Sequence, residues 1–184
     1  MFNVVIINGA PQSGKDTFVK YCEQFCDDNE CAHVINYSTV DTLKNILKQL
    51  GWDGNKTDIA RCVLANLKQF WVDECNNGPI REIVDRIMEL MINNYDEDVI
   101  FFIHCREPLE IDKIKSVLES LSIAYPISVS TLIVHRLEAE REAFTNEADK
   151  HTSDYTYDAE VWNDGTLSNL RQNAETFCSI LLEV

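Results

Sequence analysis

The chain has 184 residues, of which 45% are hydrophobic and 26% charged, with only 6 Gly and 4 Pro. This composition predicts one globular domain and excludes disordered, collagen-like and linker-rich chains. The formal net charge of -15 disfavours nucleic acid polymers and anionic membranes as partners. A small anionic ligand remains compatible with that charge, because its binding depends only on the groups that line its site.

Seven cysteines at irregular spacing predict free thiols in a reducing compartment, and therefore a cytoplasmic protein. Residues 1–7 lack a basic leader, and no apolar run reaches membrane-spanning length. We therefore expect the first residues to form a buried strand and the protein to have no membrane partner.

Apolar β-type runs alternate with helical patterns along the chain. Strands are expected at Val4–Ile7, His33–Tyr37, Val99–Ile103, Thr131–His135 and Tyr157–Trp162. Helices are expected at Lys15–Phe25, Thr39–Leu50, from Thr57 to Asn77, from Pro79 past Met91, at Pro108–Leu121, Arg136–Phe144 and Leu167–Leu182. This alternation predicts an α/β fold with a parallel sheet covered by helices on both faces.

The segment between the second and third strands, 38–98, is about twice as long as a simple crossover requires. Thr57 is a suitable N-cap for a helix whose apolar residues recur at helical spacing, and Pro79 suits the first turn of the next helix. We expect the apolar stripes of both helices to be core; the first comprises Ile59, Cys62, Val63, Leu67, Phe70 and Trp71. Extra helices of this kind typically serve a ligand, so 38–98 is interpreted as an insertion within a single domain, 1–184.

The most informative segment follows the first strand and opens the first helix. It reads Gly9-Ala10-Pro11-Gln12-Ser13-Gly14-Lys15 and fits the phosphate-loop pattern G-x-x-x-x-G-K. The two glycines allow consecutive backbone N–H groups to converge on one phosphate, and the helix N-terminus adds partial positive charge. Lys15 is then expected to reach the β- and γ-phosphates, which predicts ATP as the cofactor.

Asp16 occupies the position at which this pattern usually has Ser or Thr. A carboxylate beside a triphosphate is repulsive unless a cation lies between them, so Asp16 predicts Mg²⁺ as a second cofactor. Two alternatives are that Asp16 only favours the helix N-terminus, and that the Thr17 hydroxyl contacts the metal.

The string from Gly9 to Thr17 resembles the phosphate loop of the deoxynucleoside monophosphate kinases of phage type and their bacterial relatives. The Gly14-Lys15-Asp16 portion also resembles animal-type phosphomevalonate kinase. His104-Cys105-Arg106-Glu107-Pro108 is similar to the strand-then-Asp-x-Arg segment of the nucleotide kinases, with His104 at the acidic position. Asn163-Asp164-Gly165-Thr166-Leu167 resembles a turn shared by many small-molecule kinases.

The resemblance implies a P-loop NTPase fold with strand order 2-3-1-4-5, an insertion that closes over the phosphate acceptor, and a short lid at 136–156. It implies catalytic roles for Lys15, Arg106 and Arg136, with Arg141 as a further lid arginine. Arg136 and Arg141 diverge by roughly 140° if they share one helix, so both reach one phosphate only if the helix is broken. Asn163 and Gly165 would lie beside the adenine. Acceptor-binding residues would be Ser38, Asp41, Lys44, Arg61, Lys68, Arg106 and Arg141.

Simpler interpretations exist for several of these residues. Arg106 could pair with a neighbouring glutamate, the cations of 38–98 could lie on solvated helix faces, and Asn163 to Gly165 could be only a strand-to-helix turn. The sequence thus predicts transfer of the ATP γ-phosphoryl group to a nucleoside or deoxynucleoside monophosphate. The alternatives are another small phosphorylated acceptor, a nucleotide-binding sensor with degraded activity, and a nucleic-acid-dependent ATPase, which the net charge disfavours.

Overall fold

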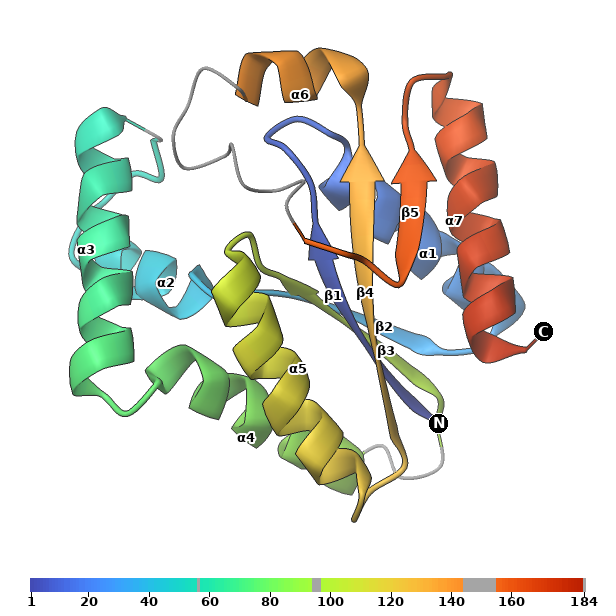
Figure 1. Ribbon diagram of the computed structural model, residues 1–184, viewed down its shortest axis with the longest axis horizontal. Coiled ribbons are helices and arrows are strands. Elements are labelled where there is room, and N and C mark those ends of the chain that lie inside the picture. The colour runs from blue at the N-terminus through green and yellow to red at the C-terminus, as the bar shows by residue number, and fades with distance from the viewer. Residues whose placement is uncertain (56, 94–96, 144–154, 184) are drawn as a thin grey trace. The chain divides into compact units, whose positions relative to one another are not determined.

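The computed structural model describes residues 1–55, 57–93, 97–143 and 155–183 (Figure 1). It divides into two compact units: Met1–Tyr37 together with Asp96–Val184, and Ser38–Tyr95. The second unit corresponds to most of the insertion expected at 38–98. No helix in the described part of the chain has the length and hydropathy needed to cross a membrane.

A five-stranded parallel sheet forms the centre of the first unit, and its order, β2-β3-β1-β4-β5, confirms the prediction. The strands are β1 (Phe2–Asn8), β2 (His33–Ser38), β3 (Val99–His104), β4 (Ile127–His135) and β5 (Ala159–Trp162). β1 pairs with both β3 and β4, which places Ile7 opposite His104 and Asn8 opposite Ile133. The loops that leave β1, β3 and β4 therefore emerge side by side at the carboxyl edge of the sheet.

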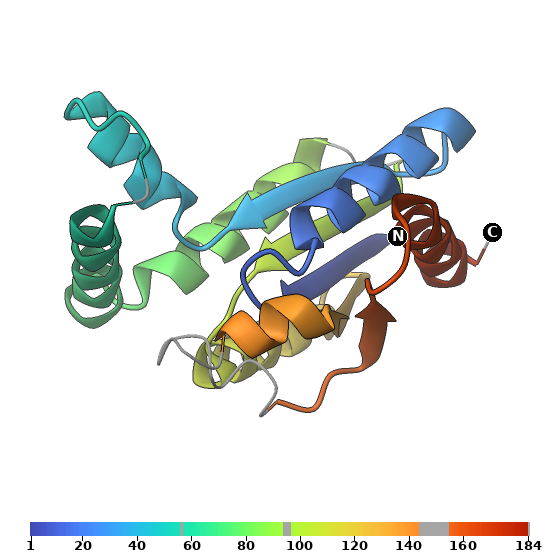
Figure 2. The same cartoon turned by 90° about the horizontal axis from the view of Figure 1, so that it is seen from above.

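Helices cover both faces of this sheet (Figures 1 and 2). The helices of this unit are α1 (Lys15–Asn29), α5 (Pro108–Ser122), α6 (Leu137–Ala143) and α7 (Leu167–Leu182). α1 and α7 pack together, and their apolar residues share one core cluster with Val5, Ile7 and Phe102 of the strands. α5 packs against β4 on the opposite face. Because β1 is buried along its whole length, its apolar run needs partners on both faces.

Buried thiols belong to the core between α1 and α7. Cys22, Cys26 and Cys178 are buried there, and all seven cysteines are free. A hydrogen bond with Cys178, together with burial, raises the pKa of Cys26 far above its usual value. These thiols act as small apolar side chains.

The second unit contains three helices, α2 (Asp41–Gln49), α3 (Asp58–Glu74) and α4 (Gly78–Asn93). Thr57 caps α3 as predicted, its hydroxyl accepting from the backbone N–H of Ala60 at 3.2 Å. Gly78 lies so close to the Trp71 indole that a Cβ atom there would overlap it, which brings the end of α3 against the start of α4.

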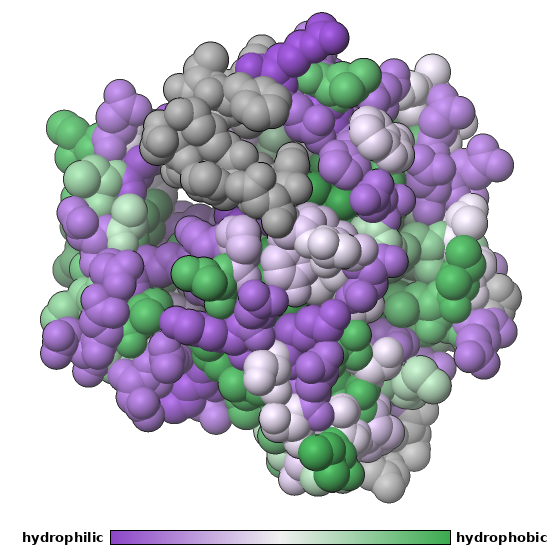
Figure 3. Space-filling view, in the orientation of Figure 1, coloured by the Kyte–Doolittle hydropathy of each residue, from purple (hydrophilic) through white to green (hydrophobic). Residues whose placement is uncertain are grey.

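The predicted burial of the α3 stripe is wrong. None of its residues is buried, and Ile59, Val63 and Phe70 are 78%, 39% and 59% exposed. Helical periodicity defines an apolar face, but it does not specify a partner for that face. On the face drawn in Figure 3, hydrophilic side chains predominate and apolar groups are scattered among them.

Several element boundaries also differ from the prediction. β4 begins at Ile127 instead of Thr131, because Ser128 and Ser130 alternate with apolar residues and interrupt the continuous run. α1 continues four residues beyond Phe25, to Asn29. α6 begins at Leu137, which leaves Arg136 in the connection before the helix.

Candidate active site

The loop between β1 and α1 has the backbone geometry of a phosphate cradle. Gly9, Gln12 and Gly14 have φ angles of 146°, 65° and 97°, which turn the chain sharply between strand and helix. A Cβ atom on Gly9 would overlap the carbonyl oxygen of Val134, so only glycine permits this close approach to β4. The loop leads directly into the N-terminus of α1, where backbone N–H groups favour an anion.

The ammonium of Lys15 lies within the loop. Its Nζ donates to the carbonyl oxygens of Gly9 at 2.6 Å and Ala10 at 2.9 Å. The backbone N–H of Ser13 donates to the same Ala10 oxygen at 3.1 Å, which closes the turn. The positive charge is thus already placed at the mouth of the cradle.

Two oxygen-bearing side chains follow Lys15 on the first turn of α1. Asp16 has a side chain that is 92% exposed, and Thr17 lines the same cavity as Lys15. Carboxylate and hydroxyl oxygens are the donors that Mg²⁺ prefers, so this pair fits a magnesium ion bound together with phosphate oxygens. His104 approaches from the end of β3, with its Nδ1 atom 3.8 Å from Oδ1 of Asp16.

The far side of the cradle is fixed by Asn163, at the carboxyl end of β5. Its side-chain Nδ2 donates to the carbonyl oxygen of Ser13 at 2.9 Å, and its backbone N–H donates to the carbonyl oxygen of His135 at 2.8 Å. A Cβ atom on Gly14 would overlap this Nδ2 atom. The resemblance implied that Asn163 would lie beside the adenine base. Its hydrogen bond to Ser13 of the phosphate loop was not predicted, because no local pattern indicates a contact across 150 residues.

Two cavities adjoin at this edge of the sheet. A cavity of about 280 Å³ is lined by Gln12, Gly14, Lys15, Asp16, Thr17, Arg136, Asn163, Leu167 and Leu170. A cavity of about 560 Å³ is lined by Arg136, Leu137, Glu138, Arg141, Asn163, Asp164, Gly165 and Leu167. Because three residues line both cavities, one elongated ligand can occupy the two together.

Arg136 lies between the two cavities. Its guanidinium donates to the carbonyl oxygen of Gln12 at 3.4 Å and forms an ion pair with Glu138 at 3.0 Å. Arg136 precedes α6, and it lines the larger cavity together with Arg141, so the two arginines face one space in spite of the predicted 140° divergence. The structure places Arg141 in the larger cavity beside Asn163 and Gly165. Of the lid expected at 136–156, residues 144–154 lie outside the described residues.

Arg106 is exposed immediately after β3, and its carbonyl oxygen accepts a hydrogen bond from the Asn8 side chain at 3.1 Å. It therefore emerges at the same edge of the sheet as the phosphate loop, as predicted. In the second unit, Asp41 brings together two expected acceptor-binding residues: it accepts from the Ser38 backbone N–H at 3.0 Å and pairs with Lys44 at 2.8 Å. Arg61 pairs with Asp58 at 3.6 Å, and Lys68 is partly buried on α3.

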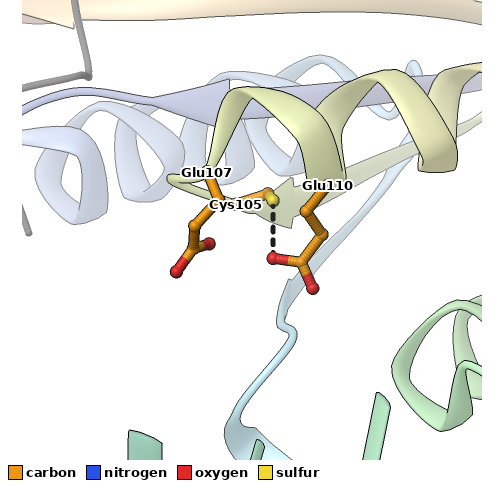
Figure 4. A group of neighbouring side chains, drawn as sticks. All are labelled: Cys105, Glu107 and Glu110. Carbon is orange, nitrogen blue, oxygen red and sulfur yellow. Dashed lines mark hydrogen bonds between the residues drawn. The ribbon is translucent and has the colours of Figure 1, made fainter. Parts of the chain in front are cut away.

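A separate group of ligand-type side chains surrounds the start of α5. Donor atoms of Cys105, Glu107 and Glu110 lie within 4.8 Å of one another, and the Cys105 thiol donates to Glu110 at 3.2 Å (Figure 4). The positive end of the α5 dipole disfavours a cation at this point, and the hydrogen bond already gives the buried thiol a partner. We assign no metal to this group.

The sequence matches no protein-family model and no curated protein. Solved structures share its fold over nearly the whole chain. The Mycobacterium tuberculosis APS kinase CysC in complex with AMPPNP and APS is 13% identical, with a TM-score of 0.53 over 99% of this chain and 98% of that chain. A cysteine-to-alanine variant of that enzyme is 11% identical, with a TM-score of 0.51 over 95% and 96%. The crystal structure of APE1195 is 13% identical, with a TM-score of 0.54 over 98% and 95%. At these identities, the likeness establishes the fold.

Proposed function

We propose that this protein is an ATP-dependent kinase of a small phosphorylated molecule, with a nucleoside or deoxynucleoside monophosphate as the acceptor. The observation that carries the proposal is the pair of adjoining cavities that share Arg136, Asn163 and Leu167. The smaller cavity offers Lys15 and a helix N-terminus to a polyphosphate. The larger one offers a polar space to a nucleoside, lined by two leucines, the Asn163 amide and charged side chains.

Catalysis on this arrangement consists of positioning and charge neutralisation. Lys15 exchanges its loop carbonyl partners for the β- and γ-phosphates, and the backbone N–H groups of the loop hold the β-phosphate. Arg136 neutralises charge that develops on the transferring group. Asp16 and Thr17 would hold Mg²⁺, which would supply further charge neutralisation for the phosphates.

The acceptor is proposed to bind on the side of Arg106, whose guanidinium would pair with its phosphate. Lys44, Arg61 and Lys68 of the second unit are the further phosphate-binding cations that the resemblance implies. A phosphate oxygen is already a nucleophile at neutral pH, so no general base is required. The AMPPNP and APS complex of the structural neighbour suggests APS as a further acceptor to be tested.

The proposal is tested by acceptor-dependent ADP release across nucleoside monophosphates, deoxynucleoside monophosphates, APS and phosphomevalonate. A thermal-shift measurement with a non-hydrolysable ATP analogue and Mg²⁺ accompanies it, because a ligand that binds only the folded state raises the melting temperature. Turnover on a monophosphate supports the proposal. Binding of the analogue with no turnover on any acceptor favours a nucleotide sensor, and failure to bind the analogue excludes both.

A further inference from the structure

Asn8, the last residue of β1, forms side-chain hydrogen bonds with three separate segments. It is fully buried. Its Oδ1 accepts from the backbone N–H of Gly9 at 2.7 Å, while its Nδ2 donates to the carbonyl oxygen of Arg106 at 3.1 Å and to the Tyr157 hydroxyl at 2.6 Å. A primary amide has one acceptor oxygen and two N–H donors, so each is engaged.

The partners of Asn8 lie far apart in sequence but meet at one point of the sheet. β1 lies between β3 and β4, where the strand order reverses and where ligands of open α/β sheets bind. The Asn8 side chain thus links Gly9, the first residue of the phosphate loop, to the main chain of Arg106 and to the Tyr157 hydroxyl. An apolar residue here would leave a buried carbonyl and a buried N–H without these partners.

Tyr157 is itself held firmly. Its ring makes an edge-on contact with Tyr155 at 5.0 Å, and burial raises the pKa of its hydroxyl to about 12, so the group stays neutral at physiological pH. The next residue, Asp158, accepts hydrogen bonds from the Thr131 hydroxyl at 2.8 Å and from Lys115 at 3.1 Å. These bonds fix the main chain beside Tyr157 to β4 and α5.

We propose that Asn8 and Tyr157 are positioning residues that hold Arg106 in register with the phosphate loop. The inference rests on the proposed function and deepens it, because it names the contacts that set the distance between the acceptor side and the donor side of the site. Neither side chain is a catalytic residue. Asn8 acts through the backbone of Arg106, and Tyr157 acts through Asn8. A displacement of about 1 Å between reacting groups lowers the rate by roughly 100-fold.

Two variants remove these contacts to different extents. Tyr157→Phe deletes one hydroxyl and keeps the ring packing, and we expect kcat/KM for the acceptor to fall about tenfold. Asn8→Ala removes all three hydrogen bonds, and we expect a fall of about 100-fold. In both variants the affinity for the non-hydrolysable ATP analogue should change by less than about threefold, because the loop amides and Lys15 remain.

The decisive readout is epistasis with Arg106. In an Arg106→Ala background, Tyr157→Phe should produce no further fall in kcat/KM, because the group that it positions is already absent. A full tenfold fall in that background would show that Tyr157 does not act through Arg106 and would overturn the proposal. Asn3→Ala is the matched control: Asn3 is also buried, at the opposite end of β1, and its substitution should lower stability without changing the ratio of kcat to KM.

Hydrogen exchange separates this inference from the proposed function. In Tyr157→Phe and Asn8→Ala, the backbone amides of 105–107 should exchange several-fold faster than in the unmodified protein, at temperatures well below unfolding. Unchanged exchange in both variants overturns the positioning role whether or not an acceptor is found. Faster exchange in a protein that turns over no acceptor supports the coupling and counts against the proposed reaction alone.

Discussion

The imidazole of His104 meets the carboxylate of Asp16 across the start of α1, with Nδ1 and Oδ1 3.8 Å apart. His104 ends β3, and Asp16 occupies the first turn of the helix after the phosphate loop. In the kinases that the sequence resembles, the β3 position is acidic. Here the pair consists of the Asp16 carboxylate and the His104 imidazole. The kinases that the sequence resembles have oxygen-bearing side chains at both positions.

Restoring the acid should strengthen cation binding. We expect His104→Asp to lower the Mg²⁺ concentration that gives half-maximal activity by about tenfold, because a second carboxylate beside Asp16 increases the attraction for a divalent cation. The measurement is a Mg²⁺ titration of ADP release at saturating ATP. His104→Asn is the control with a neutral side chain, and an equal response of the two variants would contradict a role for charge at this position.

Removal of the Lys15 ammonium should abolish catalysis and spare the fold. We expect Lys15→Ala to lower kcat by about 1000-fold, since one donor to the transferring group is lost. Lys20→Ala, on the exposed face of the same helix, is the matched control and should retain full activity. A Lys15→Ala protein that turns over at the normal rate would refute the mechanism.

Gly14 and Gly51 share a φ of +97° but differ in their surroundings. A Cβ atom on Gly51 meets nothing within 4 Å, whereas one on Gly14 overlaps Asn163. We expect Gly51→Ala to lower the free energy of unfolding by about 1 kcal/mol and Gly14→Ala by about 3 kcal/mol, with loss of ATP-analogue binding only in the latter. Urea denaturation measures the free energy of unfolding of both variants. Equal losses of that free energy would show that the overlap with Asn163 does not destabilise the protein.

Asp158 should make stability depend on pH. Burial raises the pKa of its carboxyl, but hydrogen bonds from Thr131 and Lys115 outweigh that effect and hold it below the ordinary value of 3.8. Its contribution is therefore complete above pH 3.8 and is lost as pH falls through the lower folded-state pKa.

We expect Asp158→Asn to lower the free energy of unfolding at pH 7 by about 1 kcal/mol, a modest value because the side chain is 48% exposed. The difference from the unmodified protein should shrink as the pH is lowered below 3.8. Asp27→Asn, on the exposed surface of α1, is the control and should leave the pH profile unchanged. A constant difference at all pH values would exclude the ionised carboxylate as the source.

Local patterns predicted those parts of the fold that local chemistry determines. The apolar runs located all five strands, and Thr57 and Pro108 marked the starts of two helices, because capping and proline geometry act within a few residues. The glycines and Lys15 likewise predicted the phosphate loop. The exposed stripe of α3 was not predicted, since its burial depends on what packs against it.

The contacts made by Asn8 and Asn163 could not be predicted for a related reason. Each side chain donates to a backbone carbonyl almost 100 residues away or more, and such a contact leaves no periodicity in the sequence. Asparagine at the end of a strand is also common in ordinary turns. Only the strand order brings these amides to the loops that they hold.

Because Lys15 donates hydrogen bonds to Gly9 and Ala10, the proposed binding of nucleotide would be an exchange of partners for this ammonium. After the γ-phosphoryl group has left, one of the lysine's new partners is gone, and the loop carbonyls can recapture the charge. In the proposed reaction, the same contacts that oppose ATP on its arrival help to expel ADP, so we expect the lysine's resting position to favour rapid turnover over tight retention of the product.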